Sequence, residues 1–138
     1  DPRYGTFRSL FKSGDMFDVE FCYNIIPNVI SPVDMDTYEK NPVEFYVTCT
    51  DVQTGEAVYH KSVRMQDSLK WVQASASMPL VSRVVKADGK EYLDGGIADS
   101  IPIDFMRQRG YDKNIVILTR PRGYKKKKNK LILFVLVK

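Results

Sequence analysis

The chain has 138 residues, 43% of them hydrophobic, which is enough for one ordinary core, so we expect a single domain or part of one. Its formal charge of +4 is unevenly placed: residues 1–119 hold 13 Lys and Arg against 17 Asp and Glu, whereas residues 120–138 hold 8 basic residues and no acidic one. A folded nucleic-acid-binding domain carries its positive charge on a structured face. The composition therefore argues against a nucleic-acid partner.

Cysteine content and hydropathy argue against several further classes of protein. Cys22 and Cys49 are too few for a disulfide framework and lack the C-x-x-C and His spacing of a zinc site, so we expect two reduced thiols, no metal and no other cofactor. No charged and then apolar leader opens the chain, and the apolar run at residues 131–137 is far shorter than the roughly 20 residues that span a bilayer. These features predict a cytoplasmic protein.

The N-terminal third predicts two short helices separated by a loop. Residues 3–14 have apolar and aromatic residues near helical spacing and end on a glycine, which predicts a first helix. Residues 19–36 mix aromatic and β-branched residues with two prolines, which predicts an extended loop. Either Asp34 or Asp36 can cap a helix of one or two turns that ends before Pro42.

A hairpin is the clearest strand signal. Residues 43–50 are rich in Val, Phe, Tyr and Thr, and the turn residues DVQTGE separate them from a second run at 57–63. We therefore expect two paired strands.

A helix should follow the hairpin. Leu69, Val72 and Ala76 share one helical face, which we expect to be the buried one. Either Asp67 or Ser68 is suited to cap its N-terminus, and a proline follows its C-terminal end.

The remaining elements alternate between strand and helix. Residues 82–94 read as strand, Asp-Gly turn and strand. Residues 102–109 form a helix that Pro102 starts and Gly110 stops, and the apolar run at 114–120 predicts a strand covered on both faces. This alternation predicts an α/β fold.

Most nucleophile and phosphate signatures are absent from the sequence. There is no G-x-S-x-G, no P-loop and no G-x-G-x-x-G. His60, the single histidine, lies in a predicted strand on the face opposite Tyr59, where a structural role is the better interpretation. A triad that needs histidine is therefore disfavoured.

One carboxylate remains as a candidate, Asp94 in the stretch LDGG. A carboxylate at the end of a strand, followed by residues that accept unusual backbone angles, can be aimed across a cleft as a general base. Asp and Gly are also simply favoured in turns. The tripeptide alone leaves both interpretations open.

The longer stretch QASASMPLVSRVVKADGKEYLDGGIADSIPI resembles the C-terminal catalytic part of bacterial patatin-like phospholipases, in which an Ala/Ser-Ser-x-x-x-Pro segment precedes a strand pair that ends in D-G-G or D-G-A. The flanking stretches CTDVQTGE and NIVILTRPRGYKKK are similar too, so the likeness covers most of residues 1–124. The matching residues of the first motif are Ala74, Ser75 and Pro79, and those of the second are Asp94, Gly95 and Gly96.

The resemblance implies part of a three-layer α/β sandwich with a mixed sheet and flanking helices. It also implies a lipid acyl hydrolase, a phospholipase or esterase, with a Ser-Asp dyad in which Asp94 takes the proton of the serine directly. The family's glycine-rich oxyanion loop and its G-x-S-x-G serine precede the matching region, and neither occurs in these residues. We therefore expect residues 1–124 to supply the base but no nucleophile, to be inactive alone, and to self-associate through an exposed sheet.

Three nearby polar residues are weaker candidates. Ser75 and Ser77 lie where a helix ends, and close packing explains them better than nucleophilic chemistry does. Asp99 precedes a predicted helix and is expected to cap it or to interact with its dipole.

The tail at residues 125–138 and the residues just before it are rich in basic side chains and suggest a binding function. A non-catalytic lipid- or protein-binding module that has kept the fold is the alternative to the enzyme. Peripheral contact with an anionic membrane would use the basic side chains of this region. They are Arg120, Arg122, Lys125, Lys126, Lys127 and Lys128.

Overall fold

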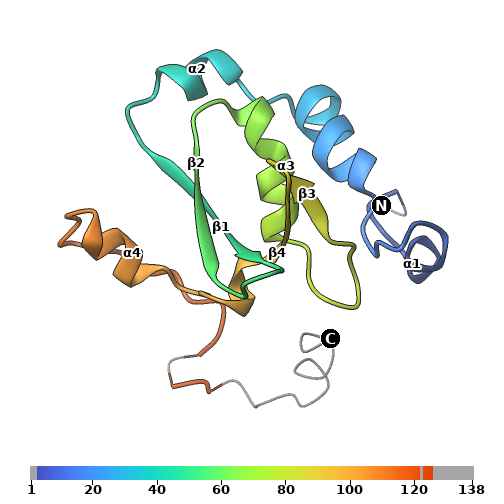
Figure 1. Cartoon of the computed structure of the whole chain (residues 1–138). Coiled ribbons are helices and arrows are strands. Elements are labelled where there is room, and N and C mark those ends of the chain that lie inside the picture. Colours follow the sequence, from blue (N-terminus) through green and yellow to red (C-terminus); the bar gives the residue numbers. More distant parts are fainter. Residues whose placement is uncertain (1–2, 122, 126–138) are drawn as a thin grey trace. The chain divides into compact units, whose positions relative to one another are not determined.

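The computed structural model describes residues 3–121 and 123–125 of the chain. The chain divides into two compact units, Asp1–Ser100 and Ile101–Lys138. The first unit contains a four-stranded sheet in the order β2-β1-β4-β3, with helices before, between and after its strands (Figure 1). All three strand pairings are antiparallel. The α/β class predicted from the sequence is therefore confirmed.

The predicted hairpin forms the first half of the sheet. Strand β1 (Phe45–Asp51) pairs with β2 (Ala57–Ser62) along its length, with Val47 opposite His60. β1 is also a central strand, because β4 pairs with its other side.

The second strand pair is confirmed as well. Strand β3 (Val85–Ala87) turns through Asp88 and Gly89 into β4 (Lys90–Asp94). Both turn residues have positive φ angles, 47° and 77°, as a tight hairpin turn requires. The pairing of β4 with β1 places residue 94 opposite Cys49, so the LDGG stretch lies at the middle of the sheet.

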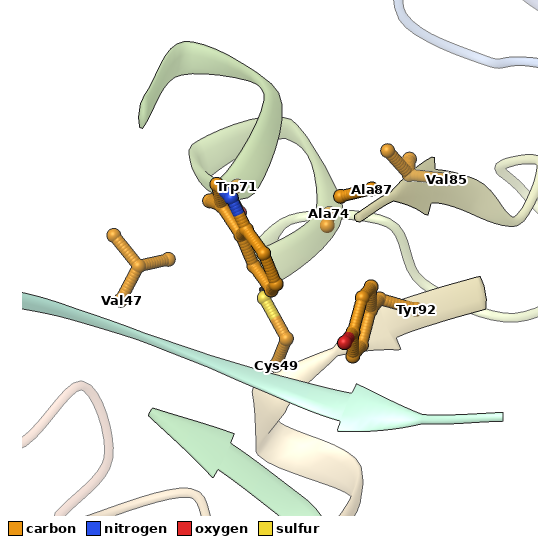
Figure 2. Close-up of a cluster of buried hydrophobic side chains, with 7 residues drawn as sticks. All are labelled: Val47, Cys49, Trp71, Ala74, Val85, Ala87 and Tyr92. Carbon is orange, nitrogen blue, oxygen red and sulfur yellow. Dashed lines mark hydrogen bonds between the residues drawn. The ribbon is translucent and has the colours of Figure 1, made fainter. Parts of the chain in front are cut away.

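Helix α3 (Met65–Ser75) covers one face of this sheet and contacts all four strands. Its Trp71 ring stacks on His60, with ring centroids 4.2 Å apart, and lies 4.7 Å from the Tyr92 ring. Figure 2 shows the resulting core, in which Trp71 points from α3 toward Cys49 of β1 and Tyr92 of β4. The residues of this cluster are Val47, Cys49, Trp71, Ala74, Val85, Ala87 and Tyr92.

Two details of the predicted third helix are wrong. The helix begins at Met65, and its N-cap is Arg64 rather than Asp67 or Ser68. Its buried face carries Ser68, Trp71 and Ala74, whereas Leu69 and Val72 are half-buried and Ala76 is exposed. The large Trp71 ring fills the space over the sheet, and the helix is rotated so that this ring faces inward.

The two short N-terminal helices are confirmed. Helix α1 (Phe7–Ser13) starts at Thr6, whose side chain accepts a hydrogen bond from the Ser9 N–H, and it ends at Gly14, which has a φ of 80°. Helix α2 (Met35–Lys40) is capped by Asp34, whose carboxylate accepts from the Thr37 N–H at 2.9 Å.

The predicted loop at residues 19–36 is wrong, because Phe21–Ile30 form a π-helix, η1. Proline disrupts an α-helix since it lacks an N–H and its ring meets the preceding turn. In η1 the turns are wider, as the bond from the Ser31 N–H to the Ile26 carbonyl five residues back shows, and Pro27 lies within them. Asn28 donates a side-chain bond to the Asn24 carbonyl at 2.8 Å, which stabilises the same turns.

The second unit contains helix α4 (Ile103–Gln108), close to the range predicted for it, followed by Gly110 with a φ of 87°. The predicted strand at 114–120 is wrong: residues 111–118 form no helix or strand, and Ile115 and Ile117 are 96% and 89% exposed. A strand exists only through pairing with a neighbour. The described ranges contain no partner strand for this run. The tail beyond Lys125 lies outside the described residues.

Candidate functional site

The two sequence motifs meet at the end of α3. Ala74 is fully buried in α3, Ser75 is the last residue of that helix, and Pro79 lies in the loop that follows. Asp94 is the last residue of β4, and its N–H donates to the Ser77 carbonyl at 2.9 Å. The fold therefore joins the segment of the first motif directly to the backbone of the residue that carries the carboxylate of the second.

The Asp94 side chain lies on the face of the sheet that α3 covers. Side chains alternate along a strand, so Asp94 lies on the same face as Tyr92, which contacts Trp71. The carboxylate is half-buried, and its Oδ1 accepts a hydrogen bond from the Gly96 N–H at 2.7 Å. Among the described residues, nothing donates to its other oxygen, Oδ2. The carboxylate is thus oriented by one oxygen and has the other available.

Thr50 holds the backbone that follows this carboxylate. Its hydroxyl donates to the Asp94 carbonyl at 2.8 Å and accepts from the Ala98 N–H at 3.2 Å. Thr50 is buried in the central strand β1, so water has little access to the contact. Nothing in the sequence indicates this role, because threonine is an ordinary residue of a strand.

The glycine after Asp94 is required by a close approach of two backbones. A Cβ at Gly95 would lie 2.2 Å from the Thr48 carbonyl oxygen and 2.6 Å from its carbon. Gly95 begins the single 3₁₀ turn η2 (Gly95–Ile97), which packs on β1. The D-G-G sequence therefore lets the chain turn sharply across the sheet directly after the carboxylate.

Cys49 lies opposite Asp94 in the ladder and is fully buried. Burial, and secondarily the negative charge of Asp94, raise the pKa of the Cys49 thiol to about 12. At neutral pH the residue is therefore an uncharged thiol, and it donates to the Trp71 carbonyl at 3.5 Å. We assign it a packing role.

This pKa predicts how stability changes at alkaline pH. The thiol ionises near 9.0 in the unfolded chain and only near 12 in the folded one, so the unfolded state loses its proton first. We expect the free energy of unfolding to fall as the pH rises from about 9 to about 12. Cys49→Ala should reduce that slope, measured by urea unfolding at several pH values, and an unchanged slope would contradict the assignment.

The weaker candidates have structural contacts. The Ser77 hydroxyl donates to the Gln73 carbonyl at 2.7 Å, and His60 is stacked on Trp71, where burial lowers its pKa. Asp99 does not cap α4, because the N-cap of this helix is Pro102 and no side chain caps it, so the capping expectation is wrong. The expected interaction of Asp99 with the helix dipole stays a prediction. The Asp99 carboxylate accepts from the Tyr59 hydroxyl at 2.7 Å. The residues described contain no cluster of three His, Cys, Asp or Glu side chains that could hold a metal.

A cavity of about 400 Å³ opens beside the first motif. Its walls come from the N-terminal segment, from η1 and from the end of α3, where Ser77 is one of the lining residues. The sequence does not reveal this cavity, because part of its wall comes from η1, where the sequence predicts an extended loop. We call it the η1 cavity.

Comparison with known proteins confirms the family resemblance. Residues 2–107 match the patatin-like phospholipase family. The chain is also 30% identical over 129 residues to the uncharacterized protein YjjU of Escherichia coli strain K12, a stretch that covers 86% of this chain and 36% of that protein. The chain belongs to the patatin-like phospholipase family, and it spans about a third of the length of this curated relative.

Proposed function

We propose that this chain supplies the general base of a lipid acyl hydrolase that uses a Ser-Asp dyad. Asp94 is the base. The observation that supports it best is the 2.9 Å bond between the Asp94 N–H and the Ser77 carbonyl, which joins both family motifs around a half-buried carboxylate. Family membership supports a lipid ester as the substrate class.

The chemistry follows from the orientation of the carboxylate. A serine hydroxyl is a weak nucleophile until a neighbouring base takes its proton. Oδ1 of Asp94 is engaged by the Gly96 N–H, so Oδ2 is the atom that would accept that proton as the serine oxygen bonds to the ester carbonyl carbon. Loss of the alcohol, which regains the proton, leaves an acyl-serine, and Asp94 then activates the water that releases the acid.

The nucleophile in this proposal lies outside these 138 residues. The sequence contains neither a G-x-S-x-G nor a glycine-rich loop to stabilise the oxyanion. In the proposed enzyme, both come from residues that precede Asp1. Ser75 and Ser77 are not proposed as substitutes, since the Ser77 hydroxyl is already bonded within its own helix end.

An assay of the 138-residue chain tests whether the base and the nucleophile lie in different parts of the proposed enzyme. The purified chain should hydrolyse a short p-nitrophenyl ester no faster than buffer does, because a base without its nucleophile cannot form the acyl intermediate. Hydrolysis that disappears in Asp94→Asn would contradict the proposal, since the chain would then contain a complete dyad.

Several finer expectations remain predictions. Peripheral contact with anionic lipid is supported by the charge of the basic region, of which Arg120 and Lys125 are described and exposed. Its other predicted residues, Arg122, Lys126, Lys127 and Lys128, lie outside the described residues. No helix in the described part of the chain is long and apolar enough to cross a bilayer. Four further expectations also remain predictions: self-association, the cytoplasmic location, the boundary at residue 124 and the alternative of a non-catalytic binding module.

A further inference from the structure

The loop that joins α3 to β3 contains a residue in an unfavourable backbone conformation. Leu80 has a φ of 73°, in the left-handed region that residues with a bulky side chain rarely adopt. Its side chain is 55% exposed, so burial of the leucine does little to offset the cost. A strained backbone of this kind persists only where its surroundings over-determine it. The bonds on either side of Leu80 therefore have to hold the loop in place.

On the α3 side, the loop is held by the end of the helix. The Ser77 N–H donates to the Ala74 carbonyl at 3.0 Å, and the Ser77 hydroxyl donates to the Gln73 carbonyl at 2.7 Å. The loop is closed by the Ser82 N–H, which donates to the Met78 carbonyl at 3.0 Å. These bonds fix where the loop begins, and a different segment of the chain fixes where it ends.

On the β3 side, the loop is held by two residues that follow α1. The Met16 N–H donates to the Val81 carbonyl at 2.8 Å. The Asp15 carboxylate accepts from the Arg83 N–H at 2.7 Å through Oδ1 and from the Arg83 Nε at 2.8 Å through Oδ2. The Asp15 side chain is only 7% exposed, so removing it would leave buried donors without a partner. We call these three bonds the Asp15 clamp.

The Asp15 clamp lies a short distance along the chain from the candidate base. The residues that it holds come just after Leu80, and Ser77, whose carbonyl accepts the Asp94 N–H at 2.9 Å, comes just before it. We propose that Asp15 is a positioning residue for the hydrolytic reaction, because its clamp keeps the strained loop in place and so keeps the Ser77 carbonyl on the backbone of Asp94. This inference rests on the proposed function, in which Asp94 is the base.

Amide hydrogen exchange of the 138-residue chain, followed by NMR, tests this positioning. The most protected amides of β1 and β2 report global unfolding, so the measured quantity is the exchange rate of the Asp94 amide divided by theirs. Asp15→Ala removes both carboxylate bonds and should raise this ratio by about tenfold or more, which corresponds to about 1.4 kcal/mol of local opening. An unchanged ratio would show only a loss of global stability and would overturn the inference.

Asp18→Ala is the matched control. Asp18 lies in the same N-terminal segment, and its carboxylate accepts from the Phe21 N–H at 2.8 Å, away from the loop. This variant should change the ratio by less than about twofold, against the tenfold rise expected of Asp15→Ala. Equal rises in the two variants would overturn the inference, because any weakening of the N-terminal segment would then release Asp94.

Leu80→Gly, added to Asp15→Ala, tests the part played by strain. Glycine adopts the left-handed region at no steric cost, so the loop no longer needs the Asp15 clamp to hold it there. The double variant should return the ratio to within about threefold of the wild-type value. A double variant that keeps the full tenfold rise would contradict the inference.

Asp15→Asn decides the matter if Asp15→Ala does not give the wild-type circular dichroism spectrum. Asparagine keeps an oxygen for the Arg83 N–H and loses the bond to Nε, so the ratio should rise by about fivefold. A wild-type ratio in this variant would overturn the inference.

The effect on catalysis is measured in a longer protein that carries the G-x-S-x-G serine. There Asp15→Ala should lower kcat for a short ester by about 10- to 10²-fold, because a small displacement of a catalytic group is costly. KM should stay within about twofold, since the loop is not proposed to bind the substrate. A wild-type kcat in a variant whose Asp94 amide exchanges faster would overturn the positioning role.

The two proposals fail separately. If Asp94→Asn keeps its rate of hydrolysis in the longer protein, the proposed base is wrong, and the exchange ratio still decides whether the Asp15 clamp holds the backbone of Asp94. If Asp94→Asn abolishes hydrolysis while Asp15→Ala changes neither the ratio nor kcat, the inference about Asp15 is overturned and the proposed function stands.

Discussion

Asp94→Asn, introduced into a longer protein that carries the glycine-rich loop and the G-x-S-x-G serine, should lower kcat for a short ester by about 10²- to 10⁴-fold. Asparagine has the shape of aspartate, and its Oδ1 can still accept the Gly96 N–H, so the turn after β4 is kept. The substitution removes the carboxylate oxygen Oδ2, which is the atom proposed to take the proton. KM should change little, because the carboxylate is not proposed to bind the acyl chain.

Asp88→Asn provides the control for this measurement. Asp88 lies in the turn between β3 and β4 with a φ of 47°, a conformation that asparagine also tolerates, and it is exposed. Its substitution should leave kcat within about twofold, against the 10²- to 10⁴-fold loss expected of a general base. If both variants kept the wild-type rate, Asp94 would not be the base.

Gly95→Ala should lower the free energy of unfolding of the 138-residue chain by about 3–5 kcal/mol, or prevent folding. The added methyl would lie 2.2 Å from the Thr48 carbonyl oxygen, which belongs to the central strand and cannot move without disturbing both of its neighbours. Urea unfolding followed by circular dichroism measures the change.

Gly55→Ala separates this clash from the general effect of replacing a turn glycine. Gly55 has a φ of 73° and open space around it, so alanine there meets only backbone strain of about 1–2 kcal/mol. Equal losses in the two variants, or a Gly95→Ala protein as stable as the wild type, would show that the close approach of η2 to β1 does not constrain the site.

Local sequence patterns predicted most of the sheet and its connections. The Asp-Gly turn at residues 88–89 and the DVQTGE turn set the two hairpins, because few residues adopt positive φ without cost. The motifs containing Ser75 and Asp94 likewise indicate a candidate site, whose role in catalysis stays a prediction. These features depend on short stretches of chain, which are visible in a sequence.

Features that depend on tertiary packing were missed. The proline at position 27 argued for a loop, but η1 contains it through wider turns. The burial of Trp71 rather than Leu69 was decided by the space over the sheet, and the apolar run at 114–120 has no partner strand in the described ranges. Thr50 and the η1 cavity were missed for the same reason, since their roles come from contacts between distant segments.

The most direct test of the dyad is a crystal structure of the longer protein after its serine has been trapped by a fluorophosphonate. The measured quantity is the distance from the trapped serine Oγ to the nearer carboxylate oxygen of Asp94. We predict about 2.6–3.2 Å, the range in which a proton can pass directly between them. A separation well beyond hydrogen-bond reach, with the Asp94 carboxylate turned toward bulk water, would contradict its role as the base.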